Sequence, residues 1–470
     1  MNSIITRFAP SPTGNLHIGG VRTALINFIV TQQAKKRNLD SKFLLRIEDT
    51  DTKRSNNKFK DNIINGLDWL GITFDNEIYI QSQKIKRHRE IAYELLNKNK
   101  AFKCICTKEV LEKKRYENQK NKKNVKRLCN LCEKNPKIQS LEKDYVIRIK
   151  IPNTNKTYIN DLVQGSIIID NQEIDNFILL RNDGSPTYML SVVVDDFDMG
   201  VNLIIRGDDH LNNAFRQFFI YKNMNWPIPK YAHIPLIHGE DGKKLSKRHG
   251  SVDINEFKEL GYLKAAIINN LILLGWSPSN SNEILEIDKI IELFDLNKIS
   301  KSSSIFSYDK LNFFNNHFIK KDNNLNHLYD YLKGNVILKN YIENDKYKFK
   351  RLILIYKNNI SFYKSLENIC FTYFDKKFTT KKNKLFINTF NKLIKEFLMI
   401  LEKSDIWDLD SLEKDLNDFI KIKKIKFILF GKPLRLVLLN QENGPSIKNI
   451  LYILGKKNTI LRIKNYIKQI

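Results

Sequence analysis

The chain has 470 residues, 42% of them hydrophobic, and carries 79 Lys and Arg against 52 Asp and Glu, a net charge of +27. This composition excludes a disordered chain, and no run approaches the ~18 apolar residues of a membrane span. With no signal peptide either, we expect a cytoplasmic protein of about three domains that makes no membrane contact. The positive charge favours a polyanion partner. The alternative is that the charge reflects the Lys, Asn and Ile bias of an AT-rich genome, which adds lysines whether or not the protein binds a polyanion.

The first half of the chain alternates short apolar runs with amphipathic helical patterns, which favours an α/β fold with a Rossmann-like parallel sheet. The apolar runs 192–194 and 203–205 return to this pattern after a basic, cysteine-containing stretch at 100–137. In chain order, the predicted elements are strand 4–8, helix 18–36, strand 43–47, helices 58–70 and 84–97, and strands 145–151 and 166–170. After about residue 255 helical periodicity dominates.

Two motifs suggest nucleotide chemistry. The loop from Phe8 to Gly20 joins a strand to a helix, and a helix N-terminus offers unpaired N–H donors to phosphate. The second motif, 244–248, places three cations in five residues, which suits a migrating pyrophosphate charge. Taken alone, the lysine loop is more often a solvated surface and the glycines near Gly19 could serve helix packing. The pair of motifs is far more specific.

These motifs resemble those of a known family. His17-Ile18-Gly19-Gly20 and Lys244-Leu245-Ser246-Lys247-Arg248 look like the two signatures of class I aminoacyl-tRNA synthetases. The flanking segments resemble bacterial-type glutamyl-tRNA synthetases across the whole chain, most strongly over residues 4–80 and 180–250. These segments are 7–14, 45–51, 205–210 and 451–457. Class I enzymes generally have a second His at the position that Gly20 occupies in this chain. The backbone and His17, rather than two imidazoles, are therefore expected to contact the phosphates.

The resemblance implies a Rossmann-like catalytic domain with an inserted acceptor-stem domain, followed by an all-α anticodon-binding domain. The implied segments are the first catalytic half (1–85), the insertion (86–190), the second catalytic half (191–240), a stem-contact domain (241–320) and the anticodon-binding domain (321–470). The last segment holds 30 basic against 15 acidic residues, which suits RNA. A solvated helical bundle enriched in lysine by drift is the alternative.

Glutamate brings two carboxylates and one ammonium, so its site needs an Arg fork and an acceptor for the amine. By resemblance, the glutamate-binding residues are Arg7, Ala9, Ser11, Glu48, Tyr188 and Arg206. The ATP-binding residues are Pro10, Thr13, His17, Gly19, Gly20, Lys244, Leu245, Ser246, Lys247 and Arg248, of which His17, Gly19, Lys244 and Lys247 are expected to be catalytic. An ion pair of Arg206 with Asp208 or Asp209 is the alternative role for that arginine.

The implied activity is that of a monomeric glutamate–tRNA ligase that uses ATP with Mg²⁺. It would form glutamyl-adenylate, only with tRNA bound, and transfer glutamate to the terminal adenosine of tRNA-Glu. Three alternatives remain: glutamyl transfer to a modified base of tRNA-Asp, a non-catalytic RNA-binding relic, and a glutaminyl enzyme.

Four of the five cysteines lie within 29 positions, as Cys104, Cys106, Cys129 and Cys132. Close cysteine pairs in a cytosolic protein favour a structural tetrahedral Zn²⁺ site. In some relatives the fourth ligand falls two residues after the third, where this chain has Leu131, so Cys132 would have to serve. A site degraded by drift is the alternative.

For the anticodon, RNA readers need cations and planar groups that stack on bases. We expect Lys357, Tyr356, Phe362 and Tyr363 to supply them. Some relatives use an Arg nearby to read the third anticodon base, and our alignment places Asn359 there. This leaves open whether tRNA-Gln is also an acceptor.

Overall fold

The computed structural model describes residues 3–51, 54–121, 126, 128–246, 250, 252–279, 281–321, 325–374, 378 and 389–469. The chain forms two compact units, one of Met1–Lys258 with Lys264–Leu311 and one of Glu259–Leu263 with Asn312–Ile470. Within the described residues, no helix is long and apolar enough to cross a membrane.

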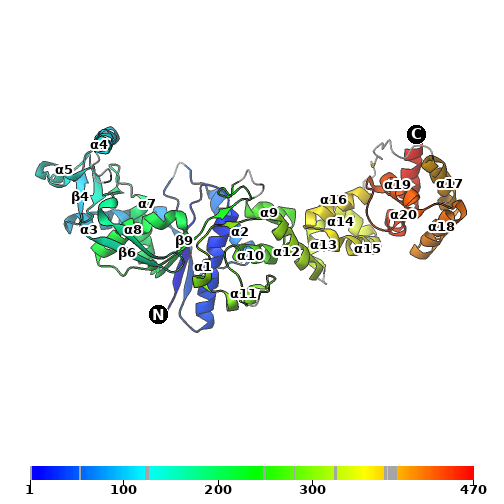
Figure 1. Ribbon diagram of the computed structural model, residues 1–470, viewed down its shortest axis with the longest axis horizontal. Helices are drawn as coiled ribbons and strands as arrows, with labels where there is room; N and C mark the ends of the chain where they lie inside the picture. The colour runs from blue at the N-terminus through cyan, green and yellow to red at the C-terminus, as the bar shows by residue number, and fades with distance from the viewer. Residues whose placement is uncertain are drawn as a thin grey trace. The chain divides into compact units, whose positions relative to one another are not determined.

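The N-terminal sheet confirms the predicted parallel arrangement. Strands β1 (Ile5–Phe8), β2 (Lys42–Ile47) and β3 (Tyr79–Ile80) pair in parallel in that order. Helix α1 (Ile18–Lys36) has the predicted bounds and packs between β1 and the helices α10 (Lys264–Ile272) and α11 (Ile287–Leu293) (Figure 1). Since partners surround α1, most of its circumference is buried and its hydrophobic pattern is not amphipathic.

A second sheet carries the other half of the parallel core. Strand β9 (Leu203–Gly207) pairs in parallel with β10 (Lys230–Ile234), which pairs in parallel with β6 (Lys156–Asp161). An antiparallel strand, β7 (Gly165–Asp170), completes it, so two strands of the predicted insertion extend the sheet of β9. The Asn202 amide donates to the Ile5 carbonyl over 3.1 Å, which places the starts of β1 and β9 side by side.

The remaining elements of this region are helical or belong to a small antiparallel sheet. The apolar run 192–194 lies in the helix Tyr188–Asp198, which is buried on nearly every side. A short apolar run does not reveal whether its period is that of a helix or of a strand. The helices are α2 (Asn57–Leu70), α3 (Ile85–Asn97), α4 (Lys108–Lys120), α5 (Asn130–Glu133), α6 (Pro136–Gln139), α7 (Tyr188–Asp198) and α8 (Leu211–Met224). The small sheet has the order β4 (Ala101–Cys104), β5 (Val146–Ile149), β8 (Ile178–Leu180).

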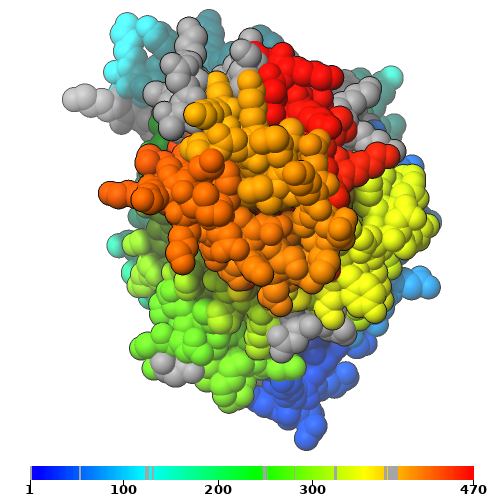
Figure 2. Space-filling model, turned by 90° about the vertical axis from the view of Figure 1, so that its right-hand side faces the viewer, coloured from blue at the N-terminus to red at the C-terminus, as the bar shows by residue number. Residues whose placement is uncertain are grey.

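Beyond β10 the described chain is helical except for the short parallel pair β11 (Ile237–His238) and β12 (Ser304–Ile305). The helices that follow in the second unit enclose one hydrophobic core, as predicted for an all-α domain. Figure 2 shows its last helices from outside, with α17 and α18 in orange and α20 in red. Besides α10 and α11, the described helices after β10 in both units are α9 (Ile254–Leu260), α12 (Tyr308–Lys321), α13 (Asn326–Lys333), α14 (Val336–Asn344), α15 (Lys346–Tyr356), α16 (Tyr363–Phe374), α17 (Thr389–Lys403), α18 (Leu409–Lys423), α19 (Phe427–Leu439) and α20 (Ile447–Ile467).

Candidate functional site

A cavity of about 840 Å³ lies where β1 and β9 end, at the carboxyl edge where open α/β sheets bind ligands. The two motifs, 227 residues apart in sequence, meet on its walls. Thr13 is not among the described residues that line it, and Lys247 and Arg248 lie outside the described residues. The predicted residues on its walls are Arg7, Ala9, Pro10, Ser11, His17, Gly19, Gly20, Glu48, Tyr188, Arg206, Lys244, Leu245 and Ser246.

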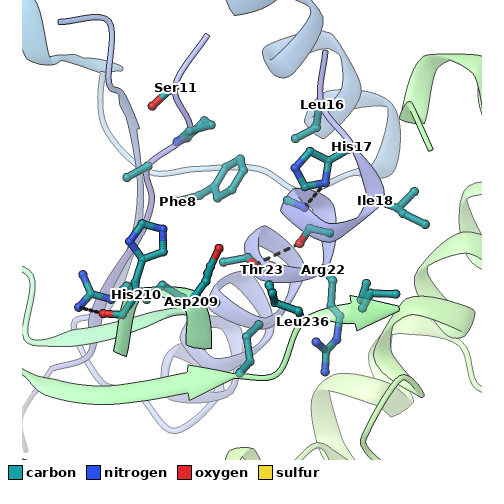
Figure 3. Close-up of a pocket in the computed structure, with 18 of the residues that line it drawn as sticks. Phe8, Ser11, Leu16, His17, Ile18, Arg22, Thr23, Asp209, His210 and Leu236 are labelled. Atoms are coloured by element: carbon teal, nitrogen blue, oxygen red, sulfur yellow. Dashed lines mark hydrogen bonds between the residues drawn. The ribbon is translucent and has the colours of Figure 1, made fainter. Parts of the chain in front are cut away.

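His17 is the N-cap residue of α1. Its Nδ1 accepts the amide hydrogen of Gly20 over 3.3 Å. In the view of Figure 3, the rings of His17 and His210 lie on opposite sides of Phe8. A Cβ at Gly19 would lie 3.0 Å from this nitrogen, so a side chain there would displace the ring. Burial, followed by the charge of Lys244, lowers the pKa of His17. A neutral imidazole that accepts at Nδ1 carries its proton on Nε2, where it is a donor for a phosphate oxygen.

Arg206, at the end of β9, is a buried cation with 6% exposure and no carboxylate partner within 4.0 Å among the described residues. Its Nε donates to His233 Nε2 over 3.1 Å and its Nη2 to the carbonyl of His210 over 3.3 Å. Its Nη1 is buried without a hydrogen-bond partner in the described structure. The alternative ion pair with Asp208 or Asp209 is not formed, and Asp209 instead accepts from Lys244 Nζ over 3.4 Å. A buried guanidinium in this state can bind a ligand carboxylate.

Arg7 and Glu48 belong to a buried charge network that the sequence did not reveal. Arg7 donates from Nε and Nη2 to the two oxygens of Asp196 over 2.9 and 3.3 Å. Arg46, which is fully buried, joins Asp196 (2.5 Å from Nη1) to Glu48 (3.1 Å from Nη2). Burial raises the pKa of Glu48 despite the nearby charges of Arg46 and Arg7. The negative charge of Glu48 is therefore only partly balanced, and the ammonium group of a substrate would balance it further.

His210 and Asn213 also line the cavity, although neither was predicted as a site residue. Nδ1 of His210 lies 3.1 Å from the Tyr188 hydroxyl and 3.3 Å from Asn213 Nδ2. Burial and the charge of Arg206 lower the pKa of His210. His210 is the last residue of the segment 205–210, so the sequence indicated it only as part of a motif and not as a cavity residue. Asn213 follows in α8, and no sequence pattern indicated a role for it.

The four clustered cysteines come together as predicted. Their Sγ atoms all lie within 4.8 Å of one another, and all four are free thiols. The Gln139 side chain braces the site, since it donates to the carbonyls of Lys103 and Cys132 and accepts from the Lys103 amide. With Zn–S bonds of about 2.3 Å, a tetrahedral site separates its sulfurs by about 3.8 Å, so the donor set fits Zn²⁺.

Two of the three aromatic residues predicted to stack on RNA are buried. Tyr356 and Tyr363 are buried in the core of the second unit, where the Tyr356 hydroxyl lies 3.1 Å from that of Tyr373. Phe362 is half-buried and stacks on Tyr262. Tyr356 ends α15 and Tyr363 begins α16, and both side chains pack in the core that these helices share. Asn359, by contrast, is exposed at the end of the 3₁₀ turn Lys357–Asn359.

Comparisons with known proteins agree along the whole chain. Residues 3–313 match the family of class I tRNA synthetases (E and Q), catalytic domain, and residues 325–467 match an anticodon binding domain. The chain is 40% identical to glutamate–tRNA ligase 2 of Zymomonas mobilis, covering 98% of this chain and 96% of that one. It is also 40% identical to glutamate–tRNA ligase 1 of Orientia tsutsugamushi, with 98% and 97% covered. The crystal structure of a glutamate–tRNA ligase from Elizabethkingia meningosepticum, in complex with its amino acid, matches with a TM-score of 0.84 at 28% identity and covers 99% of both chains.

Proposed function

The chain belongs to the class I tRNA synthetases for glutamate and glutamine, and on this basis we propose that it is a glutamate–tRNA ligase. It activates L-glutamate with ATP and attaches it to the 3′-terminal adenosine of tRNA-Glu. The observation that carries this proposal is Arg206, a buried guanidinium without a carboxylate partner among the described residues, in the same cavity as His17 and Lys244.

Within this proposal, the side-chain carboxylate of glutamate binds between Arg206 and Tyr188, and its ammonium lies near Glu48. The α-carboxylate attacks the α-phosphorus of ATP, a P–O bond to pyrophosphate breaks, and glutamyl-adenylate forms. His17 Nε2 and the N-terminus of α1 hold the phosphates, and Lys244, exposed at the mouth of the cavity, follows the leaving pyrophosphate. Mg²⁺ that accompanies ATP neutralises part of that charge. The adenosine hydroxyl of tRNA then displaces AMP. No side chain acts as a nucleophile, so positioning and charge supply the catalysis.

The proposed acceptor is tRNA-Glu, with tRNA-Gln as a second one, and the enzyme acts as a cytoplasmic monomer. The anticodon binding domain and the match along nearly the full length of the relatives favour tRNA charging over transfer to a base of tRNA-Asp. Asn359 supports the wider acceptor range, because its short exposed amide lacks the guanidinium fork with which an Arg reads a base.

Aminoacylation with radiolabelled glutamate on purified tRNA-Glu and tRNA-Gln tests the function, with glutamine as the control amino acid. We expect glutamate to be attached to tRNA-Glu and glutamine to neither tRNA. Charging of tRNA-Gln as well would support the role given to Asn359, and its absence would assign the third anticodon base to another residue. If neither tRNA were charged, the ligase proposal would be wrong.

We further propose that Cys104, Cys106, Cys129 and Cys132 hold a structural Zn²⁺, which ties the end of β4 to α5. The chain should then contain about one zinc per molecule by elemental analysis. Cys132→Ser should lose most of this zinc and melt at a lower temperature, because a three-thiolate site is left open. Cys370→Ala is the matched control, since Cys370 is a buried thiol of the second unit and should leave the zinc content unchanged. A wild-type protein without zinc would favour a site degraded by drift.

A further inference from the structure

Behind Arg206 lies a chain of buried polar groups that no step of the proposed reaction uses. Arg206 Nε donates to His233 Nε2 over 3.1 Å, and His233 Nδ1 lies 2.6 Å from Asp161 Oδ2. His233 is fully buried and Asp161 is 5% exposed. The three residues stand at the ends of β9, β10 and β6, which are neighbours in one sheet.

The hydrogen bonds fix the protonation of the imidazole. A guanidinium can only donate, so His233 Nε2 must be the acceptor and the ring proton must sit on Nδ1, facing Asp161. Asp161 is held in turn, because its Oδ1 accepts the amide hydrogens of Val163 and Gln164 over 2.9 and 2.8 Å. The Gln164 side chain also donates to the carbonyl of His233 over 3.0 Å. The chain is thus anchored at its far end by the turn that follows β6.

A neutral acceptor behind Arg206 has a consequence for binding. Arg46 and Arg7 are balanced directly by carboxylates, whereas Arg206 is held by a nitrogen without charge and a carbonyl. Its positive charge is therefore not cancelled at short range and stays available to a ligand, while Nε and Nη2 are used and Nη1 is left buried without a partner in the described structure. A carboxylate in place of His233 would hold the guanidinium equally well but would compete with the substrate for its charge.

We propose that His233 and Asp161 are positioning residues for the side-chain carboxylate of glutamate: Asp161 sets the tautomer of His233, and His233 orients the Arg206 guanidinium at the wall of the cavity. This inference rests on the proposed function. It also links glutamate recognition to β6, a strand contributed by the inserted segment of the chain.

Asp161→Asn is the sharpest test, because it keeps the turn and changes the tautomer. The Asn Oδ1 can still accept from the amides of Val163 and Gln164, while its Nδ2 becomes a donor toward His233 Nδ1. The ring then carries its proton on Nε2, where it opposes the N–H of Arg206, so the guanidinium is displaced. We expect the KM for glutamate to rise at least about tenfold, with the KM for ATP nearly unchanged and a reduced preference for glutamate over glutamine.

Asp170→Asn is the matched control. Asp170 also accepts a backbone amide hydrogen, from Gln172, at the end of the neighbouring strand β7, and it is not among the described cavity-lining residues. This variant should retain wild-type constants. An Asp161→Asn enzyme with unchanged constants for both substrates would overturn the inference, as would a rise in the two KM values together.

A second pair of variants decides the matter if Asp161→Asn folds poorly. His233→Gln can present an amide oxygen near the position of Nε2, whereas His233→Phe fills the space without an acceptor. The Gln variant should bind glutamate several-fold more tightly than the Phe variant, and equal affinities would contradict the inference. Calorimetric titration of glutamate into the wild-type tRNA complex separates the two proposals, because failure of the proposed function would abolish binding in the wild type itself.

Discussion

Replacing Arg206 by Gln should lower kcat/KM for glutamate between about 100-fold and a few thousand-fold while the KM for ATP changes little. Removing one partner of a buried ion pair costs about 3–5 kcal/mol, and each 1.4 kcal/mol corresponds to about a factor of ten in rate. The buried side chain of Arg206 offers a cation that no carboxylate of the described residues satisfies, so the glutamate carboxylate would lose its main partner. Aminoacylation kinetics at varied glutamate and varied ATP measure both constants.

Two further variants show whether charge or geometry matters. Arg206→Lys keeps the positive charge, but its single nitrogen does not span the positions that the planar guanidinium fork reaches at His233, the carbonyl of His210 and the substrate, so an intermediate loss is expected. Arg181→Gln is the control, since this exposed guanidinium bonds to Ser185 and to the carbonyl of Pro186. A wild-type glutamate constant in Arg206→Gln would remove Arg206 from the site.

The sequence predicted the parts of the site that lie within single motifs. The run from β1 through His17 into α1 contains its own turn and cap residues, so both the bounds of the helix and the placement of His17 could be predicted. Arg206, which the resemblance names as a glutamate-binding residue, lies near the end of an apolar strand and lines the cavity, since the ends of parallel strands share one edge.

What the sequence did not reveal depends on pairing across the fold. Arg46 interrupts the apolar strand β2, and Asp195 and Asp196 follow the apolar run 192–194, but only the packing of α7 against the sheet joins them. The same is true of Asp161 and His233, which are 72 residues apart. The error over Tyr356 and Tyr363 has another origin, because an aromatic residue in a helical region looks the same in a sequence whether it packs in a core or stacks on RNA.

Asp196→Asn should strongly destabilise the first unit. The Asp196 side chain is almost fully buried and accepts from both Arg7 and Arg46, so the variant leaves two buried guanidiniums short of one negative charge. A loss of about 3–5 kcal/mol is expected, which for a unit of this size lowers the melting temperature by roughly 5–8 °C. Asp198→Asn is the matched control on the same helix. Asp198 pairs with the partly exposed Arg87, and such pairs contribute about 0.2–1 kcal/mol, so a shift within about 2 °C is expected.

The dependence on pH distinguishes lost charge from lost packing. Although burial alone would raise the pKa of Asp196, the charges of Arg46 and Arg7 hold it below the usual value. A carboxyl whose pKa is lowered in the folded state contributes stability that is fully present above its unfolded pKa of about 3.9 and is lost as the pH falls through the folded pKa. The difference in melting temperature between the wild type and Asp196→Asn should therefore be constant from about pH 8 to 5 and narrow below about pH 4. A difference that persists unchanged in acid would mean that Asp196 stabilises the fold through its shape, and the two arginines would then need no buried negative charge.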